Sequence, residues 1–245
     1  MRYMLGLVFA LLPIAPAAQN LTTSEQVITA MHDRYARNWY HTLTFEQQSI
    51  THKPDGTSAT EIWQEALLLP GRLRIDMGDR SAGNGALFVN GREYLYRAGK
   101  LVNDLDRLNP LLVLGFDVYR QPVEATMGQL KALHVDASTM HEEQWNGRSY
   151  FVVGAKLGDT HTTEFWIDQE RLYFVRMLQP DEKDPKSTEE FLFEEYKQVD
   201  GGGWLAEHVV LNSGKKLVFE EKYSKVSVNP TLSESLFDPQ HFAQP

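Results

Sequence analysis

Histidine is the residue type in this chain with the widest chemical potential, because a neutral imidazole can act as a base or bind a metal ion. The chain has 8 histidines among 245 residues. None belongs to an HExxH or HxH motif or has another spacing that fits a metal site. His141 precedes Glu142 and Glu143, but neighbouring strand residues point to opposite faces, so we expect no convergence there. The sequence therefore predicts no metal site.

Other catalytic patterns are also missing from the sequence. There is no G-x-S-x-G elbow, P-loop or Rossmann fingerprint. The chain has 0 cysteines, which excludes disulfides, thiolate nucleophiles and a lipid-modified N-terminal cysteine. Carboxylate pairs of the kind glycoside hydrolases use are available in any such chain, and no spacing selects one. We expect no catalytic residue and no cofactor. An enzyme is therefore less favoured than the two other functions described at the end of this section.

Composition and charge restrict the remaining classes. The formal net charge is -9 and no cluster of Lys and Arg stands out, which disfavours nucleic acid as a partner. The hydrophobic fraction of 42% over 245 residues is enough for one sizeable core.

The N-terminus predicts export. Arg2 precedes an apolar run over residues 5–14, and small residues at Ala15 and Ala17 fit a signal peptidase site. We assign residues 1–17 to a signal peptide, because the run is shorter than the roughly 20 residues that span a bilayer. The mature chain is then expected to be soluble, in the periplasm or outside the cell.

The elements that follow predict a mainly β (α+β) fold. Helical spacing indicates one amphipathic helix over Ser24–Arg37. Alternating segments over 43–98 and 140–229 predict about ten or eleven antiparallel strands, and two short helices interrupt them within 109–134. A sheet of this length tends to curl into a barrel or half-barrel. No linker or composition shift appears, so we assign residues 18–245 to a single domain.

Several strands are hydrophobic at every position, so that both faces of the sheet are expected to be shielded from water. The segments are Leu87–Val89, Tyr94–Tyr96, Phe165–Ile167, Leu172–Val175 and Phe191–Phe193. Either helices and a filled core cover both faces, or the concave side forms an apolar pocket for a ligand. The run Leu111–Phe116 is too apolar for an exposed loop and would act as a lid over such a pocket.

The order of these parts resembles the LolA-like superfamily of outer-membrane lipoprotein-sorting proteins. The resemblance rests on WQEALLLPGRLRIDM (63–77), FVNGREYLYRAGKLVNDL (88–105) and FWIDQERLYFVRM (165–177), and it covers nearly the whole mature chain. It implies an unclosed β-barrel with helices as a lid over an apolar cavity. It also implies binding of acyl chains and transport toward the outer membrane, without catalysis. In the lipoprotein carriers a lid-contacting arginine precedes the proline of the strand turn, whereas this chain has Leu69 there.

Two sets of site residues follow from this reading. The predicted cavity lining is Trp63, Leu67, Leu69, Leu73, Ile75, Leu87, Val89, Tyr94 and Tyr96. The predicted lid residues are Leu111, Leu112, Leu114 and Phe116. Arg72 and Arg74 have the parity opposite to Leu73 and Ile75 and are expected to face outward.

The expected partner is a lipid or an acylated protein, with membrane proteins at the inner and outer membranes as further partners and the chain itself a monomer. The alternative hypothesis is a periplasmic sensor or scaffold that uses the same fold to bind a protein partner. That hypothesis predicts a filled core and an exposed apolar patch or open sheet edge.

Overall fold

The structure is a computed structural model that describes residues 20–181, 184 and 186–242. The predicted signal peptide lies outside the described residues. Helix α1 (Ser24–Tyr35) begins where expected, because Thr23 and Gln26 form a reciprocal capping box. Helices α2 (Pro110–Gly115) and α3 (Val123–Ala132) lie within the two short segments predicted to be helical. No helix of the described chain is long and apolar enough to cross a membrane.

The remaining regular structure is strand. The strands are β1 (Thr42–His52), β2 (Ser58–Leu68), β3 (Arg72–Met77), β4 (Gly85–Val89), β5 (Arg92–Arg97), β6 (Lys100–Asp106), β7 (Met140–Trp145), β8 (Arg148–Val153), β9 (Glu164–Asp168), β10 (Phe174–Pro180), β11 (Thr188–Gln198), β12 (Trp204–Ser213) and β13 (Lys216–Val228). The described residues also contain four short 3-10 helices: η1 (Arg80–Ala82), η2 (Asp117–Tyr119), η3 (Glu234–Phe237) and η4 (Pro239–His241).

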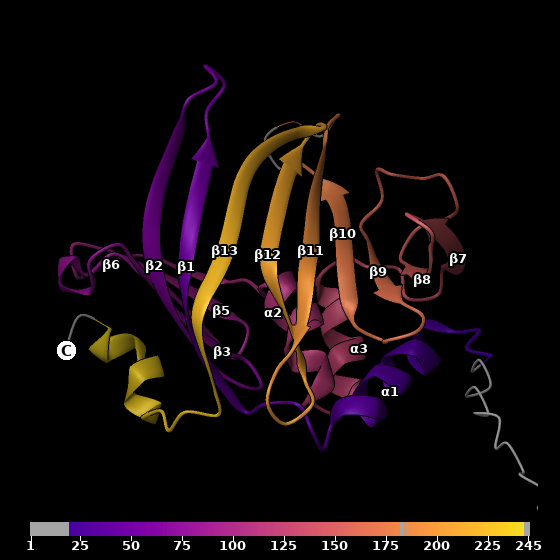
Figure 1. Ribbon diagram of the computed structural model, residues 1–245, viewed down its shortest axis with the longest axis horizontal. Coiled ribbons are helices and arrows are strands. Elements are labelled where there is room, and N and C mark those ends of the chain that lie inside the picture. Colours follow the sequence, from indigo (N-terminus) through magenta and orange to yellow (C-terminus); the bar gives the residue numbers. More distant parts are fainter. Residues whose placement is uncertain (1–19, 182–183, 185, 243–245) are drawn as a thin grey trace, which may run out of the picture.

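All strands belong to one antiparallel sheet whose order is β6-β5-β4-β3-β2-β1-β13-β12-β11-β10-β9-β8-β7. The pairing of β1 with β13 joins the first half of the chain to the last strand. The sheet curls but stays open between β6 and β7, so the predicted unclosed barrel is confirmed (Figure 1). The described chain has 13 strands rather than ten or eleven. Edge strand β6 was not predicted. All its side chains are exposed, so its sequence lacks the alternation of buried apolar and exposed polar residues that marks a strand.

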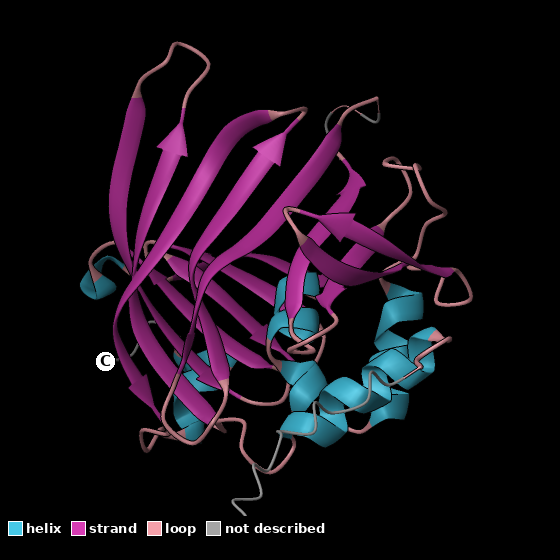
Figure 2. Cartoon of the chain, turned by 45° about the vertical axis from the view of Figure 1, so that its right-hand side comes forward, coloured by secondary structure: helices cyan, strands magenta, loops and turns pink. Residues whose placement is uncertain are grey.

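The helices pack against the concave side of the sheet (Figure 2). Val27, Ile28 and Met31 of α1 are fully buried and share one cluster with Phe165 and Phe174 of the sheet. The C-terminal helices η3 and η4 instead lie outside the curl, next to β3 (Figure 1). The curled sheet therefore has a layer of helices on one side and a short covering segment on the other.

That covering segment corrects one expectation about β3. Arg74 does point away from Leu73 and Ile75, but only 3% of it is exposed. Its guanidinium forms an ion pair with Asp76 (2.8 Å between Nη2 and Oδ1) and lies 4.3 Å above the ring of Phe242. The second face of β3 is dry because the C-terminal tail folds back over it, which the alternation of β3 alone does not reveal.

Candidate functional site

The sheet register divides the nine predicted cavity residues between the two faces. Leu67 pairs with Leu73 and Glu65 pairs with Ile75, so that these side chains share the concave face. Leu67, Leu69 and Leu73 belong to the main buried cluster, Ile75 packs against it, and Trp63 is half-buried on the same face.

The other four predicted residues lie on the convex face. Leu87 pairs with Arg74, and Tyr94 pairs with Leu87, so these side chains point away from the helices. Leu87, Val89, Tyr94 and Tyr96 form a separate small cluster with Phe242 of the C-terminal tail. The structure therefore does not bring the nine residues around one cavity. Their role in binding a ligand stays a prediction, and only the five concave residues are placed next to the helices.

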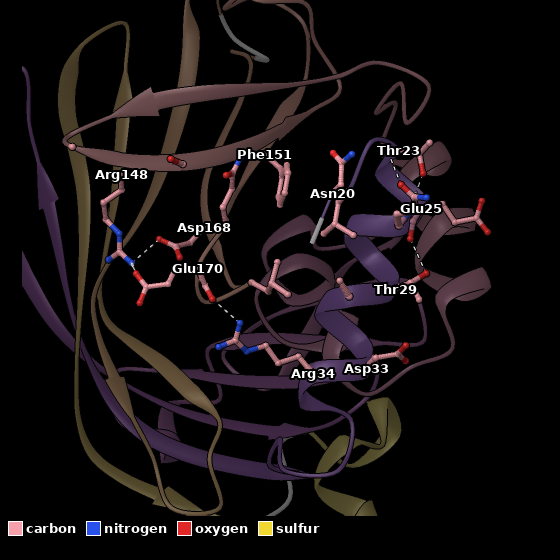
Figure 3. A pocket seen from close by; sticks show the side chains of 17 residues that line it. Asn20, Thr23, Glu25, Thr29, Asp33, Arg34, Arg148, Phe151, Asp168 and Glu170 are labelled. Atoms are coloured by element: carbon pink, nitrogen blue, oxygen red, sulfur yellow. Dashed lines mark hydrogen bonds and ion pairs between the residues drawn. The ribbon is translucent and has the colours of Figure 1, made fainter. Parts of the chain in front are cut away.

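A groove with a volume of about 1320 Å³ lies elsewhere, between α1 and the β8–β9 region (Figure 3). Its sheet side is charged: Arg148 Nη2 lies 2.9 Å from Asp168 Oδ2 and 3.3 Å from Glu170 Oε2. Arg34 of α1 donates a hydrogen bond to the Glu170 carbonyl oxygen (2.6 Å). None of the predicted cavity residues lines this groove. Its mixed lining differs from the apolar cavity that the sequence predicts.

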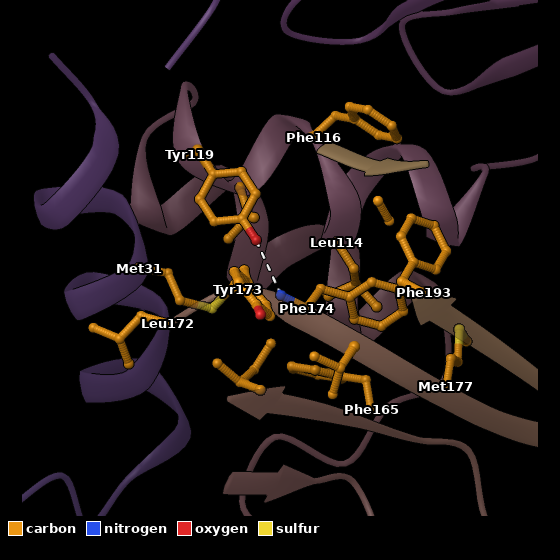
Figure 4. Packing of buried hydrophobic residues seen from close by; sticks show 14 of the residues in the cluster. Met31, Leu114, Phe116, Tyr119, Phe165, Leu172, Tyr173, Phe174, Met177 and Phe193 are labelled. Atoms are coloured by element: carbon orange, nitrogen blue, oxygen red, sulfur yellow. Dashed lines mark hydrogen bonds between the residues drawn. The ribbon is translucent and has the colours of Figure 1, made fainter. Parts of the chain in front are cut away.

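The predicted lid segment is a buried helix that packs against the concave face. Asn109 caps α2 by accepting hydrogen bonds from the Leu111 and Leu112 amides (2.9 and 3.1 Å), and Pro110 occupies the first helical turn. Leu112, Leu114 and Phe116 belong to the same buried cluster as Leu67, Leu69 and Leu73, and Leu111 packs against it. Figure 4 shows Leu114 and Phe116 next to Phe193 of β11.

Tyr119 attaches the segment after α2 to the sheet. The hydroxyl of Tyr119 accepts a hydrogen bond from the Phe174 amide (3.0 Å), which is drawn as a dashed line in Figure 4. Its ring stacks on Trp39, with 3.8 Å between the ring centroids. Burial raises the pKa of Tyr119 well above its ordinary value, so the hydroxyl stays protonated.

A second attachment joins η2, which follows the predicted lid segment, to the turn between β2 and β3. Asp117, which is 1% exposed, accepts a hydrogen bond from the Gly71 amide through Oδ1 (2.8 Å). Burial raises the pKa of Asp117 to about 7, and the Gly71 hydrogen bond partly opposes this rise. The turn also carries Leu69, which is 4% exposed and occupies the position where the resemblance implied an arginine. In this chain the contact to the turn is made by the carboxyl of Asp117.

Sequence reasoning missed several polar groups on the concave face. Gln47 and Ser49 of β1 are 0% and 3% exposed, and half-buried Glu65 and Glu221 lie on the neighbouring strands. The inward position of Glu65 could be predicted from the sequence, because within WQEALLL it has the same parity as Trp63 and Leu67.

One local expectation about the histidines is wrong. His141 Nε2 lies 3.3 Å from Glu143 Oε2, because residues two apart on β7 share a face. Among the described residues, no three His, Asp or Glu side chains gather as metal ligands would.

A single curled sheet, open at both edges and covered on its concave side by helices, defines an unclosed β-barrel. The fold is LolA-like, as the sequence resemblance implied. The structure of an outer membrane lipoprotein-sorting protein domain from Vibrio parahaemolyticus matches 91% of this chain and 98% of its own, with a TM-score of 0.59 and 14% identity.

Two further structures have the same fold. A LolA superfamily protein from Nitrosomonas europaea matches with a TM-score of 0.54 and 11% identity, over 89% of this chain and 98% of its own. A DUF1329 family protein from Desulfovibrio piger matches with a TM-score of 0.57 and 12% identity, over 89% of this chain and 97% of its own. No family model and no curated protein matches the chain. At these identities the likeness establishes the fold.

Proposed function

We propose that the protein is a periplasmic carrier that holds the acyl chains of a lipid or lipoprotein against the concave face of its sheet, for transport toward the outer membrane. The observation that carries the proposal is the shared apolar cluster. The lid residues Leu112, Leu114 and Phe116 are buried against the same concave side chains as Leu67 and Leu73. An acyl chain can replace the lid in this cluster without exposing the sheet.

The free energies of the two arrangements are comparable. Burying a large apolar side chain is worth about 1.5–3 kcal/mol, so the four lid residues together gain about 6–12 kcal/mol. An acyl chain of about sixteen carbons gains on the order of 12 kcal/mol at about 0.8 kcal/mol per methylene. Because these gains nearly balance, a ligand can enter and leave at small net cost. That is the behaviour a carrier needs, and it requires no catalytic group.

The carrier proposal is tested by native mass spectrometry of the purified protein, followed by uptake of a fluorescent fatty acid after delipidation. We expect adducts with the mass of a lipid and saturable uptake. Leu73→Ser should weaken uptake severalfold, because it places a hydroxyl on the concave face against which the acyl chain is held. The matched control is Leu157→Ser, at a leucine that is 71% exposed. Protein that carries no lipid and takes up no fatty acid would sink the proposal.

A second candidate function is a scaffold that binds a protein partner, and the edge strand β6 favours it. Every residue of β6 is exposed, and Leu101, Val102 and Leu105 are 50%, 55% and 38% exposed. An exposed apolar edge strand can pair with an extended segment of another chain. Val102→Pro should abolish capture of a protein partner and leave fatty acid uptake unchanged. Loss of uptake with partner capture intact would contradict this candidate.

A further inference from the structure

A group of hydrogen-bond acceptors lies on the concave face where β2, β1 and β13 run side by side. Glu65 of β2 is opposite Phe45 of β1, and Glu221 of β13 is opposite Ser49 of β1. Gln47 lies between Phe45 and Ser49 and shares their parity, so all five side chains project from one face. Phe45 belongs to the buried cluster beneath the helices, which identifies this face as the concave one.

This group has more acceptors than donors. The Tyr223 hydroxyl donates to Glu221 Oε2 (2.6 Å), and Gln47 Nε2 donates to Ser49 Oγ (2.9 Å). Gln47 is 0% exposed, yet its Oε1 has no hydrogen-bond partner among the described residues. Among the described residues, no group forms a hydrogen bond or an ion pair with the carboxyl of Glu65. A buried acceptor without a donor costs about 1–3 kcal/mol, so the arrangement is incomplete.

No described cation faces the two carboxyls. Lys225 forms an ion pair with Glu46 (2.8 Å) and Lys222 lies 3.7 Å from Glu220, and Glu46 and Glu220 have the parity of the convex face. Burial raises the pKa of Glu65 well above its usual range, and the charge of Glu221 raises it further. Burial likewise raises the pKa of Glu221 to about 7. Both shifts are those of carboxylates that lack a positive partner.

Aromatic rings surround these acceptors. Tyr223 stacks on Phe45, with 4.2 Å between the ring centroids. Trp63 is opposite Gln47, and its ring centroid lies 5.8 Å from that of Phe219. Trp63 and Phe219 are both half-buried on the concave face. Faces of Trp, Tyr and Phe attract cations through their ring quadrupoles, more strongly where water is excluded. Carboxylates and aromatic faces therefore both favour a cationic ligand at this position.

We propose that Glu65, Glu221 and Gln47 bind the ammonium group of a cationic amphiphile whose hydrocarbon chain lies on the apolar concave face. The inference rests on the proposed carrier function and specifies the head group. An ammonium carries N–H donors and no acceptor, which is the complement of this cluster. A divalent metal fits less well, since it needs about six oxygen ligands and fewer than three acidic or histidine side chains gather here among the described residues.

The test compares dodecylammonium, dodecanol and dodecanoate, which share one chain length, by calorimetry at about pH 8, above the pKa of Glu221. The wild type should bind dodecylammonium at least about tenfold more tightly than dodecanol. The double variant Glu65→Gln, Glu221→Gln should lose that preference and still bind dodecanol. The matched control, Glu46→Gln, Glu220→Gln, makes the same two substitutions on the convex face and should keep the preference.

The outcomes separate this inference from the carrier proposal. If the wild type binds dodecanol but shows no preference for dodecylammonium, or if the double variant keeps the preference, the ammonium site is refuted and the carrier proposal stands. If no amphiphile binds to any form, both fall. Circular dichroism checks that the double variant is folded, and Glu65→Gln alone replaces it should the double variant fail to fold.

Discussion

The carboxyl of Asp117 offers a direct test of how the predicted lid segment is held against the sheet. It is 1% exposed, hydrogen-bonds the Gly71 amide, and has a pKa raised from 3.8 to about 7 by burial. Asp117→Asn keeps an oxygen acceptor for Gly71 and removes the ionisation. We expect this variant to be more stable than the wild type near neutral pH.

The size and sign of the effect follow from proton linkage. The folded state binds the proton more tightly than the unfolded state, so the wild type loses stability as pH rises from about 4 to about 7. The shift from 3.8 to about 7 corresponds to about 4 kcal/mol once the folded-state carboxyl is ionised. Because part of this penalty is already present at about pH 5, the difference between variant and wild type should grow by about 3 kcal/mol between pH 5 and pH 8.

Urea unfolding of both proteins at about pH 5 and about pH 8 measures this difference. Raised pKa values of Glu65 and Glu221 also make stability fall with pH, but both proteins share those groups, so their effect cancels. Asp117→Ala is the control, since it removes the acceptor and should cost about 1–3 kcal/mol relative to Asp117→Asn. A difference between Asp117→Asn and wild type that stays constant from pH 5 to pH 8 would refute the reasoning.

Three further substitutions test the packing by urea unfolding. Leu114→Ala removes a fully buried side chain and should cost about 2–5 kcal/mol; a cost below about 1 kcal/mol would contradict its place in the core. Arg74→Ala should cost about 3 kcal/mol, since Asp76 loses a buried partner, and limited proteolysis should then release the C-terminal tail; an equally protected tail would contradict that packing. Thr23→Ala removes the capping box of α1 and should cost about 1 kcal/mol, so unchanged stability would contradict the cap.

The elements with strong local signals were predictable from the sequence. A helix cap at Thr22, Thr23 or Ser24, the proline at the start of α2 and the turn at Asn90–Gly91 each act over a few residues, so their presence follows from neighbouring side chains. The structure places the cap at Thr23. Strand β6 was not predictable in this way. All its side chains are exposed, and it is held to β5 by backbone pairing and by the ion pair between Arg92 and Asp104 (2.6 Å between Nη2 and Oδ1).

The candidate site was predictable only in part, because the face of a strand depends on contacts made by distant residues. Where LFV and YLY are apolar at every position, alternation cannot indicate which side faces the helices. The decisive contact is Phe242, whose ring stacks on Tyr96 at 4.1 Å. That contact joins residues that are far apart in the sequence.

Glu65 shows how a polar residue can carry more information than the apolar residues around it. In β2 it occupies an inward position between Trp63 and Leu67, where a carboxylate costs free energy unless something compensates it. On a wholly filled core face such a residue lowers stability, and a leucine in its place would avoid the cost of burying the carboxylate. On a face that receives a ligand, the same residue can select the ligand's head group, because the missing donor comes from outside. Under the proposed ammonium site, an acidic residue at an inward position of an otherwise apolar strand is a sequence signal for ligand chemistry. Gln47 on the next strand, whose Oε1 has no hydrogen-bond partner among the described residues, points to the same place in the fold.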